Sequence, residues 1–355
     1  MTLARESGEV VAPPPPALSR IITADPKLKR ILAQLPGFAA TELPVLIMGE
    51  PGTGKELVAE ALWSLSSRRH QPFYRLNCAV LSGDLASSEL FGHLKGSFTG
   101  AYRSSPGKFR LAHRGTLFLD EVGELPLVVQ PRLLRAVEQG EIEPVGGSAP
   151  LKVDVRLVAA TNQNLPQLIP QGCFRRDLYD RLAVLPIYLP PLRERGDDLL
   201  LLADYFLKEE ARRYRRAVTG FSAAARRRLQ GHPWPGNVRE LKNAVTRAVL
   251  CSSGSQVRAK DLCFPHRLTG PVFSYRQSWQ FPERRIMPHF QPTRPGRDHL
   301  QELLLAVGGN VSALARRLGV CTRTIYRWLR FHGLDLRQAR SGTRADTKLE
   351  RASNC

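Results

Sequence analysis

Short apolar runs and amphipathic stretches alternate along the first half of the chain. The runs at residues 45–48, 117–119 and 156–160 have the length and continuity of strands that are buried on both faces. Residues 26–35 instead carry leucine or isoleucine at helical spacing, and we expect another helix from residue 55 to about residue 65. Strands that alternate with helices predict an α/β fold, in which helices cover both faces of a parallel sheet.

The pattern changes after Pro190 and Pro191. Residues 198–214, 222–230 and 237–250 are predicted as helices separated by glycine and proline, which indicates a small helical lid. Residues 254–297 are rich in proline, arginine and polar groups without a sustained period, as in a linker. We therefore expect a flexible tail (1–19), an α/β core (20–190), the helical lid (191–253), the linker (254–297), a small all-α domain (298–338) and a second flexible tail (339–355).

Composition narrows the class of protein and its partners. No stretch approaches the roughly 20 continuous apolar residues that cross a bilayer, and the N-terminus lacks the basic-then-apolar order of a secretory signal. Six irregularly spaced cysteines favour reduced thiols in a cytoplasmic protein over a zinc site. The formal net charge of +20 favours a polyanionic partner, although a well-solvated arginine-rich surface is the alternative.

A phosphate-binding loop follows the first predicted strand. Residues 49–55 fit Gly-x4-Gly-Lys, in which backbone N–H groups converge on phosphate oxygens and the lysine reaches the outer phosphates of ATP. A chance glycine turn is disfavoured by the strand before it and the helix after it. The residues expected to contact nucleotide are Gly49, Glu50, Pro51, Gly52, Thr53, Gly54, Lys55 and Glu56.

Two acids end the apolar strand at residues 117–119. Asp120 is placed to hold Mg²⁺, and Glu121 is placed to orient or deprotonate the attacking water, as in other phosphoryl transfers. Adjacent acids are also common at surface turns, but the upstream phosphate loop favours catalysis. Thr161 and Asn162 follow another strand, where polar side chains can reach the γ-phosphate or its water.

Between the phosphate loop and the acidic strand end lies a glycine-hinged apolar segment that a nucleotide site does not need. It consists of Gly96, Ser97, Phe98, Thr99, Gly100 and Ala101. The two glycines give hinge freedom, and Phe98 offers an apolar contact, although in another context it would be taken as a core residue. The position of the segment suggests a loop that ATP chemistry moves against a partner.

With these residues the chain resembles the AAA+ activators of the sigma-54 form of bacterial RNA polymerase, whose loop reads GAFTGA where this chain has GSFTGA. The resemblance covers about residues 20–252 and 298–336. It implies an AAA+ P-loop ATPase with ATP and Mg²⁺ as cofactors, a hexameric ring, and contact between residues 96–101 and sigma-54. The family shares Glu56, whereas Pro51, Leu94, Ser97 and Pro131 are departures, the last of which should kink a helix or mark its first turn.

Further roles come only from the resemblance. Asn77 matches an asparagine that engages the catalytic glutamate, Thr161 and Asn162 match the first sensor, and Arg239 matches the second sensor. Arg175 and Arg181 match arginines that reach the site from the neighbouring subunit. Arg176 is an alternative to Arg175 for the first of these arginines. The purely structural alternative is that the arginines of this segment form salt bridges with Asp177 and Asp180 on the surface of a helix. Arg239 also lies in a lid helix that Asn237 and Glu240 are expected to cap.

The last helical unit has the pattern of a helix-turn-helix. A leucine stripe at residues 300–307 precedes a second helix at 311–318 and a third from residue 322 to about residue 330. In the third helix Ile325, Trp328 and Leu329 share one side. The expected DNA-binding residues are Thr322, Arg323, Thr324, Tyr326, Arg327 and Arg330. The unit resembles the Fis-type modules of these activators, which act as dimers; a basic amphipathic helix without a special role is the alternative.

We therefore expect an ATP-hydrolysing transcriptional activator that binds an upstream DNA site and remodels the sigma-54 RNA polymerase closed complex. Two alternatives are another AAA+ DNA remodeller, which the loop disfavours, and a DNA-binding regulator with a vestigial ATPase, which the filled catalytic positions disfavour. Because residues 1–19 leave no room for a sensory domain, we expect control through a separate regulatory protein, through expression level, or no further control.

Overall fold

The computed structural model describes residues 17–81, 83–98, 101–264, 295–307, 311–318 and 322–334. Contacts divide the chain into two compact units, one of residues 1–163 with 177–273 and one of residues 164–176 with 274–355. The expected domain boundaries stay predictions, and most of both tails and of the linker lies outside the described residues. No helix in the described ranges is both long and apolar enough to cross a membrane.

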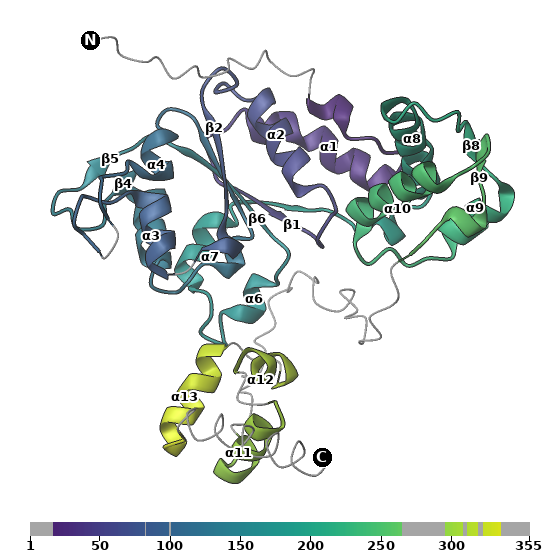
Figure 1. Ribbon diagram of the computed structural model, residues 1–355. Helices are drawn as coiled ribbons and strands as arrows, with labels where there is room; N and C mark the ends of the chain where they lie inside the picture. Colours follow the sequence, from purple (N-terminus) through teal and green to yellow (C-terminus); the bar gives the residue numbers. More distant parts are fainter. Residues whose placement is uncertain are drawn as a thin grey trace. The chain divides into compact units, whose positions relative to one another are not determined.

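A five-stranded parallel sheet forms the centre of the larger unit (Figure 1). The strand order is β2-β3-β6-β1-β7, with β1 at Val45–Met48, β2 at Phe73–Asn77, β3 at Thr116–Asp120, β6 at Arg156–Thr161 and β7 at Leu185–Tyr188. In the register, Met48 lies opposite Thr161 and Asn77 lies opposite Asp120. The carboxyl ends of the strands therefore meet at one edge, where parallel α/β sheets bind ligands.

Helices cover the sheet because its strands are apolar on both faces. Val45 and Ile47 of β1 pack with α1 and α2, whereas Leu46 between them is also fully buried, so the opposite face is covered as well. The predicted α/β fold is confirmed. The helices of the larger unit outside the lid are α1 (Pro26–Ala39), α2 (Lys55–Leu65), α3 (Gly83–Phe91), α4 (Gly107–Leu111), α5 (Gln130–Gln139) and α7 (Arg176–Leu182), whereas α6 (Leu165–Leu168) belongs to the second unit. Pro131 lies in the first turn of α5, where its missing N–H is tolerated.

Short elements complete this half of the chain. Strands β4 (Glu141–Ile142) and β5 (Leu151–Lys152) form an antiparallel pair. The 3-10 turns are η1 (Ala17–Arg20), η2 (Cys78–Val80), η3 (Val122–Glu124), η4 (Leu192–Glu194) and η5 (Ala259–Asp261), the last two of which belong to the lid.

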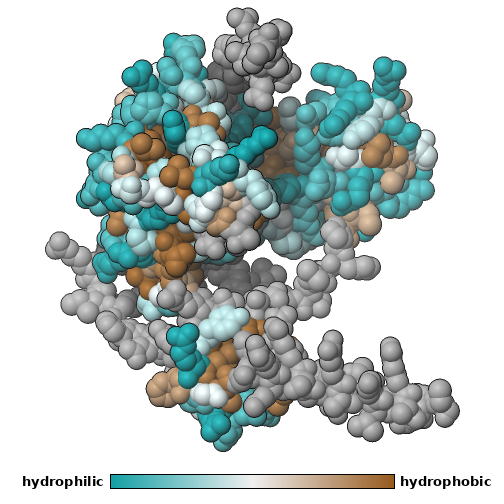
Figure 2. All heavy atoms as spheres, turned by 60° about the vertical axis from the view of Figure 1, so that its left-hand side comes forward, coloured by the Kyte–Doolittle hydropathy of each residue, from teal (hydrophilic) through white to brown (hydrophobic). Residues whose placement is uncertain are grey.

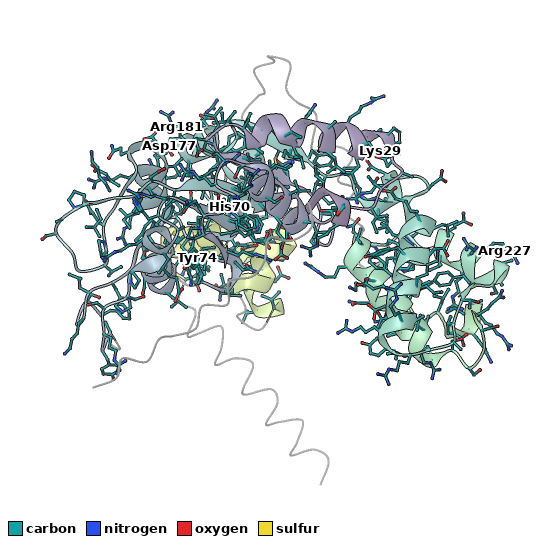
Figure 3. All side chains as sticks on the ribbon, turned by 90° about the horizontal axis from the view of Figure 1, so that it is seen from above. Lys29, His70, Tyr74, Asp177, Arg181 and Arg227 are labelled. Atoms are coloured by element: carbon teal, nitrogen blue, oxygen red, sulfur yellow. The ribbon has the colours of Figure 1, made fainter. Side chains whose placement is uncertain are left out.

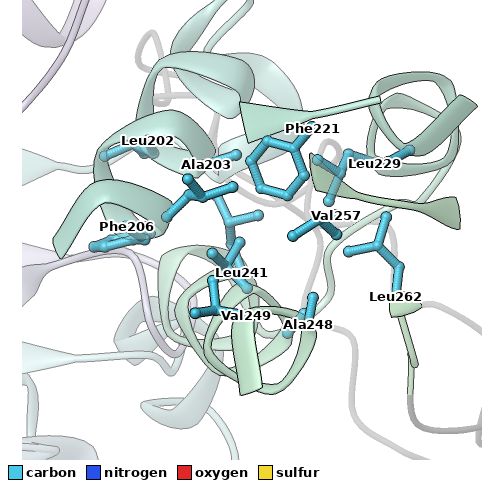
Figure 4. Close-up of a cluster of buried hydrophobic side chains, with 14 of the residues drawn as sticks. Leu202, Ala203, Phe206, Phe221, Leu229, Leu241, Ala248, Val249, Val257 and Leu262 are labelled. Carbon is cyan, nitrogen blue, oxygen red and sulfur yellow. The ribbon is translucent and has the colours of Figure 1, made fainter. Parts of the chain in front are cut away.

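The lid is the predicted helical bundle, built from α8 (Asp198–Arg213), α9 (Ala223–Gln230) and α10 (Asn237–Cys251). A short parallel pair of strands, β8 (Gly220–Phe221) and β9 (Gln256–Val257), joins the bundle and was not predicted. Figure 4 shows the apolar core between the helices and these strands. Trp234 is buried in the same core and its indole Nε1 donates to the carbonyl of Leu229 at 2.9 Å, which satisfies the polar atom of this large ring.

The C-terminal helices α11 (Arg297–Ala306), α12 (Val311–Leu318) and α13 (Thr322–His332) belong to the second unit. Their core consists of Leu300, Leu304, Val311, Leu314, Ala315, Ile325, Trp328 and Leu329. Tyr326 and Arg330 of α13 are exposed, so the predicted apolar side of this helix is confirmed. Thr322, Arg323, Thr324 and Arg327 lie in the same helix, but their side chains are outside the described part of the chain.

Candidate functional site

The phosphate-binding loop lies between β1 and α2, at the carboxyl edge of the sheet. Gly52 and Gly54 adopt positive φ angles of 78° and 104°, which glycine tolerates best. A Cβ on Gly52 would lie 2.4 Å from the carbonyl oxygen of Gly236, so glycine also permits the close approach of the lid. Lys55 is buried, and its Nζ donates to the carbonyl of Gly49 at 3.0 Å.

The ammonium group of Lys55 also lies 3.5 Å from the carboxylate Oε1 of Glu121. Burial lowers the pKa of Lys55, and the charges of Glu121 and Asp120 oppose this shift. The pKa of Asp120 is raised by burial and by the negative charge of Glu121. A cation beside Asp120 would stabilise its charged form, and carboxylate oxygens suit Mg²⁺. Within the described residues, no cluster of three or more potential metal ligands occurs.

Glu121 itself is held in an uncommon conformation. Its φ of 54° is left-handed, a state that costs a residue with a Cβ about 1–2 kcal/mol. Its Oε2 accepts a hydrogen bond from the backbone N–H of Asn162 at 2.9 Å. Thr161 is buried, and its hydroxyl accepts from the N–H of Gln163 at 3.0 Å. The sheet therefore brings together the acidic strand end and both residues predicted as the first sensor.

Asn77 does not make the contact to Glu121 that the resemblance implies. Its Oδ1 accepts from the N–H of Ala79 at 2.9 Å and caps η2 instead. The strand register places Asn77 opposite Asp120, one residue before Glu121. The backbone of Asn77 therefore lies beside the acidic strand end, but its side chain is hydrogen-bonded within its own turn.

The described residues on either side of positions 99 and 100 in the segment at residues 96–101 are hydrogen-bonded to one another. Gly96 has a φ of 81°, and its N–H donates to the carbonyl of Ala101 at 2.8 Å. The ring of Phe98 lies 5.1 Å from that of His93 and is 39% exposed, so Phe98 is not a core residue. The hydroxyl of Ser97 is buried and has no hydrogen-bond partner among the residues that the structure describes. Thr99 and Gly100 lie outside the described residues.

Comparison with known proteins agrees with these observations. Residues 21–188 match the sigma-54 interaction domain, and residues 193–271 match the AAA+ ATPase lid domain. Over 233 residues the chain is 53% identical to the Psp operon transcriptional activator of Escherichia coli K12, covering 65% of this chain and 72% of that protein. The chain belongs to the sigma-54 activator family. It is a sigma-54-dependent transcriptional activator with an AAA+ ATPase domain that binds ATP.

Two further matches extend beyond the ATPase domain. The transcriptional regulatory protein ZraR of Klebsiella oxytoca is 42% identical over 322 residues, covering 90% of this chain and 71% of that protein. The crystal structure of NtrX from Brucella abortus in complex with ATP has a TM-score of 0.61 at 30% identity, covering 88% of this chain and 69% of that one. Membership of the family implies interaction with DNA and with the sigma-54 polymerase.

In this activator the phosphate loop is bonded to the lid through a buried carboxylate, a feature that the sequence analysis missed. Glu50 is only 6% exposed. Its Oε1 and Oε2 accept from the guanidinium of Arg193 at 2.6 and 2.8 Å, and Oε2 also accepts from Nδ2 of Asn237 at 3.1 Å. Burial by itself would raise the pKa of Glu50, but these hydrogen bonds and the charge of Arg193 hold it below its ordinary value.

The expected cap at Asn237 is wrong. The helix α10 is capped at Gly236, whose N–H donates to the carboxylate of Glu240 at 2.8 Å. Asn237 is fully buried with a φ of 52°, and its Oδ1 accepts from the N–H of Leu192 at 2.7 Å. Its side chain thus bridges the lid and Glu50, because the turn directs it toward the phosphate loop rather than along its own helix.

Two more buried charges join the lid to the core. Arg195 donates to the carbonyl of Thr53 in the phosphate loop at 2.8 Å. Asp198 accepts from the N–H groups of Ala24 and Asp25 at 2.5 and 3.0 Å. Both side chains are nearly fully buried. The lid is therefore held directly to the backbone that would surround the phosphates.

The predicted arginines differ in their placement. Arg239 is exposed and lies beside the phosphate loop, because a Cβ added to Gly52 would lie 3.0 Å from the Cβ of Arg239. The charge of Arg239 lowers the pKa of Lys55, in addition to the larger effect of burial. Arg181 is 61% exposed and bonds to Glu138 at 2.6 Å rather than to a phosphate-loop residue. Figure 3 labels Arg181 together with Asp177 on α7. Arg175 is exposed and belongs to the second unit.

Proposed function

We propose that this activator hydrolyses ATP between neighbouring subunits of a hexameric ring. One chain provides Lys55 for the phosphates and Glu121 for the attacking water. Its Asp120 would hold Mg²⁺, which would neutralise phosphate charge. Arg175 and Arg181 would come from the next subunit to stabilise the charge of the transition state. The outward pairing of Arg181 with Glu138 supports a role outside its own site.

A subunit-mixing experiment tests this arrangement. Lys55→Ala removes the phosphate contact but keeps Arg181, whereas Arg181→Ala keeps the phosphate loop. Each variant alone should release phosphate at less than about 1% of the wild-type rate, since such groups contribute about 100-fold or more. Mixed rings should regain hydrolysis, because one subunit then supplies the loop and its neighbour the arginine. Recovery must be absent if Arg181 acts only within its own chain.

The hydrogen bond between Asn162 and Glu121 supports a switch within the site. The N–H of Asn162 occupies one acceptor site on Oε2 of Glu121, and Lys55 lies 3.5 Å from Oε1, so both oxygens are partly engaged before a water binds. Thr161, Asn162 and Arg239 would respond to the γ-phosphate, release the carboxylate and change the angle of the lid. The phosphate loop contacts the lid at Gly52 and Glu50, and through these contacts a change at the nucleotide would reach the lid.

The loop at residues 96–101 would contact sigma-54 and transmit this change to the polymerase. The single observation that carries the proposal is the exposure of Phe98, two residues after Gly96 with its left-handed φ. Thr99→Ala should reduce open-complex formation at a sigma-54 promoter at least tenfold while phosphate release stays within about twofold. Lys55→Ala is the matched control that should lose both. Equal loss of both activities in Thr99→Ala, or loss of neither, would contradict the proposal.

The helix α13 would read the upstream DNA site. The bases or phosphates would be contacted by Thr322, Arg323, Thr324, Tyr326, Arg327 and Arg330, and a dimer of these units would bind paired half-sites. The exposure of Tyr326 and Arg330 opposite a buried apolar side supports this orientation. Arg323→Gln should weaken binding to a genomic fragment that the wild-type chain retains, measured by electrophoretic mobility shift.

A further inference from the structure

A second basic surface lies on the lid, outside the ATP site and outside the C-terminal unit. Residues 212–228 contain seven arginines and no aspartate or glutamate. They cover the end of α8, the following loop and the first two turns of α9. We call the six arginines of this segment that are exposed the lid arginine surface: Arg212, Arg213, Arg215, Arg216, Arg227 and Arg228.

The fold brings the two halves of this segment together. The helix α8 packs on α9, and β8 between them pairs with β9. The loop after α8 turns back at Arg215, which has a left-handed φ of 51°, and the N–H of Arg216 donates to the carbonyl of Ala211 at 2.9 Å. Figure 3 shows Arg227 on the outer side of the lid. The arginines therefore lie on two packed helices and the turn between them rather than along an extended chain.

The positive charge of this surface is not neutralised within the lid. Arg226 is the one arginine of the segment paired with a carboxylate among the described residues, and its partner is Asp204 of α8. Arg228 donates to the carbonyl of Ala259 at 3.1 Å, and Arg216 donates to the carbonyl of Ser252. Bonds to carbonyl oxygens orient a guanidinium group but leave its full charge, which suits it for a phosphate.

We propose that the lid arginine surface binds the phosphate backbone of duplex DNA without sequence preference. The proposal rests on the proposed function in taking DNA as the polyanion and α13 as the element that holds it. DNA held by another part of the same chain is at high local concentration for the lid, so several weak phosphate contacts suffice. The surface would fix the lid beside DNA that flanks the site read by α13.

The test measures binding of the full chain to a random-sequence 30-base-pair duplex by fluorescence anisotropy between 50 and 200 mM salt. The lid variant combines Arg212→Gln, Arg213→Gln and Arg215→Gln. The control variant combines Lys27→Gln, Lys29→Gln and Arg30→Gln, which remove the same charge from exposed positions of α1. Both should keep the wild-type circular dichroism and phosphate release, since none of these residues belongs to the ATP site.

Three lost phosphate contacts should reduce the slope of log K against log salt by about 2.7, at about 0.9 for each contact. Wild-type affinity should therefore fall about 40-fold more than that of the lid variant across this fourfold change in salt. The control should keep a slope within about 0.5 of the wild type. Equal slopes for the lid and control variants would overturn the proposal.

A second comparison separates this proposal from the role of α13. Arg323→Gln with Arg327→Gln should weaken DNA binding independently of the lid variant. Loss of binding in the lid variant alone would support the lid and contradict the role of α13, whereas loss in the α13 variant alone would do the reverse. Binding to polyglutamate and to anionic lipid vesicles is measured in parallel. If the lid variant loses binding to either of these but keeps DNA binding, the proposal is overturned in favour of another partner.

Discussion

Replacing Glu50 by glutamine should loosen the contact between the phosphate loop and the lid. The carboxylate accepts three hydrogen bonds, two from Arg193 and one from Asn237. A glutamine has one amide oxygen, so its NH₂ group must face a donor of Arg193 or of Asn237. Substitution keeps the volume of the side chain, and the effect is therefore electrostatic rather than a loss of packing.

The expected cost follows from the burial of the pair. Breaking a fully buried ion pair costs about 3–5 kcal/mol. Arg193 is 32% exposed and can regain hydrogen bonds to water. We therefore expect a loss of stability of about 2 kcal/mol, which is the value typical of hydrogen bonds to charged groups. At an unfolding entropy of about 2.1 cal/mol/K per residue, this cost corresponds to a fall in Tm of about 3 °C for a chain of 355 residues. Differential scanning fluorimetry on the full chain without nucleotide measures the shift.

The lid provides a matched control in the exposed pair of Arg226 and Asp204, whose side chains are 40% and 36% exposed. Arg226→Gln should cost less than about 1 kcal/mol, as exposed pairs do. A double-mutant cycle of Glu50→Gln with Arg193→Gln should show a coupling above about 1 kcal/mol. The reasoning is refuted if Glu50→Gln shifts Tm no more than Arg226→Gln.

The pH dependence of this difference has a defined sign. The pKa of Glu50 in the folded chain lies below its ordinary value of 4.5. A carboxyl group with a lowered pKa contributes stability above the unfolded pKa and loses it as pH falls through the folded pKa. The Tm difference between wild type and Glu50→Gln should therefore be constant above about pH 5.5 and shrink below about pH 4.5. A difference that grows as pH falls would contradict the assignment.

Three other expectations concern buried groups. Ser97→Ala removes a buried hydroxyl that has no partner among the described residues. Tm should therefore stay unchanged or rise by the equivalent of at most about 1 kcal/mol. A fall in Tm equivalent to more than about 1 kcal/mol in scanning fluorimetry would reveal a hydrogen-bond partner. Asp198→Ala leaves donors of the core unsatisfied and should cost about 3 kcal/mol, seen as a Tm fall several times larger than that of Arg226→Gln. Burial raises the pKa of Cys78 to about 12, so iodoacetamide at pH 8 should label the exposed Cys251 within minutes and Cys78 only after denaturation; rapid labelling of Cys78 would contradict its burial.

Exposed apolar residues gather in patches on the face turned toward the viewer in Figure 2. Leu94 and Phe98 are 45% and 39% exposed, and Tyr102 is 84% exposed. The exposed Leu94 adds to the apolar surface near the loop at residues 96–101. Tyr102→Ala is a useful companion to Thr99→Ala, because it tests contact at a side chain that the structure describes fully.

The sequence did not predict β2 and β7, but by itself it determined three of the five strands of the parallel sheet (β1, β3 and β6), the phosphate loop, the acidic strand end and the apolar side of α13. Each of these depends on residues close together in the chain, where periodicity, glycine spacing and strand length act directly on the backbone. The loop at residues 96–101 was found for the same reason, since its composition departs from its surroundings over a few positions. Of the two outcomes expected for Pro131, a kinked helix or a first turn, the structure shows the first turn, which accommodates the proline ring without distortion.

Only the tertiary structure decided which polar side chains pair with one another. Glu50 and Asn237 are 187 residues apart, and Glu50 looked like an ordinary position of the phosphate loop. Asn237 looked like a helix cap, because local rules favour that role, but packing of the lid directed its amide into the core. Asn77 likewise took a local bond instead of the expected one. Such pairings depend on where distant elements meet and on which donors are buried together, and sequence spacing contains neither.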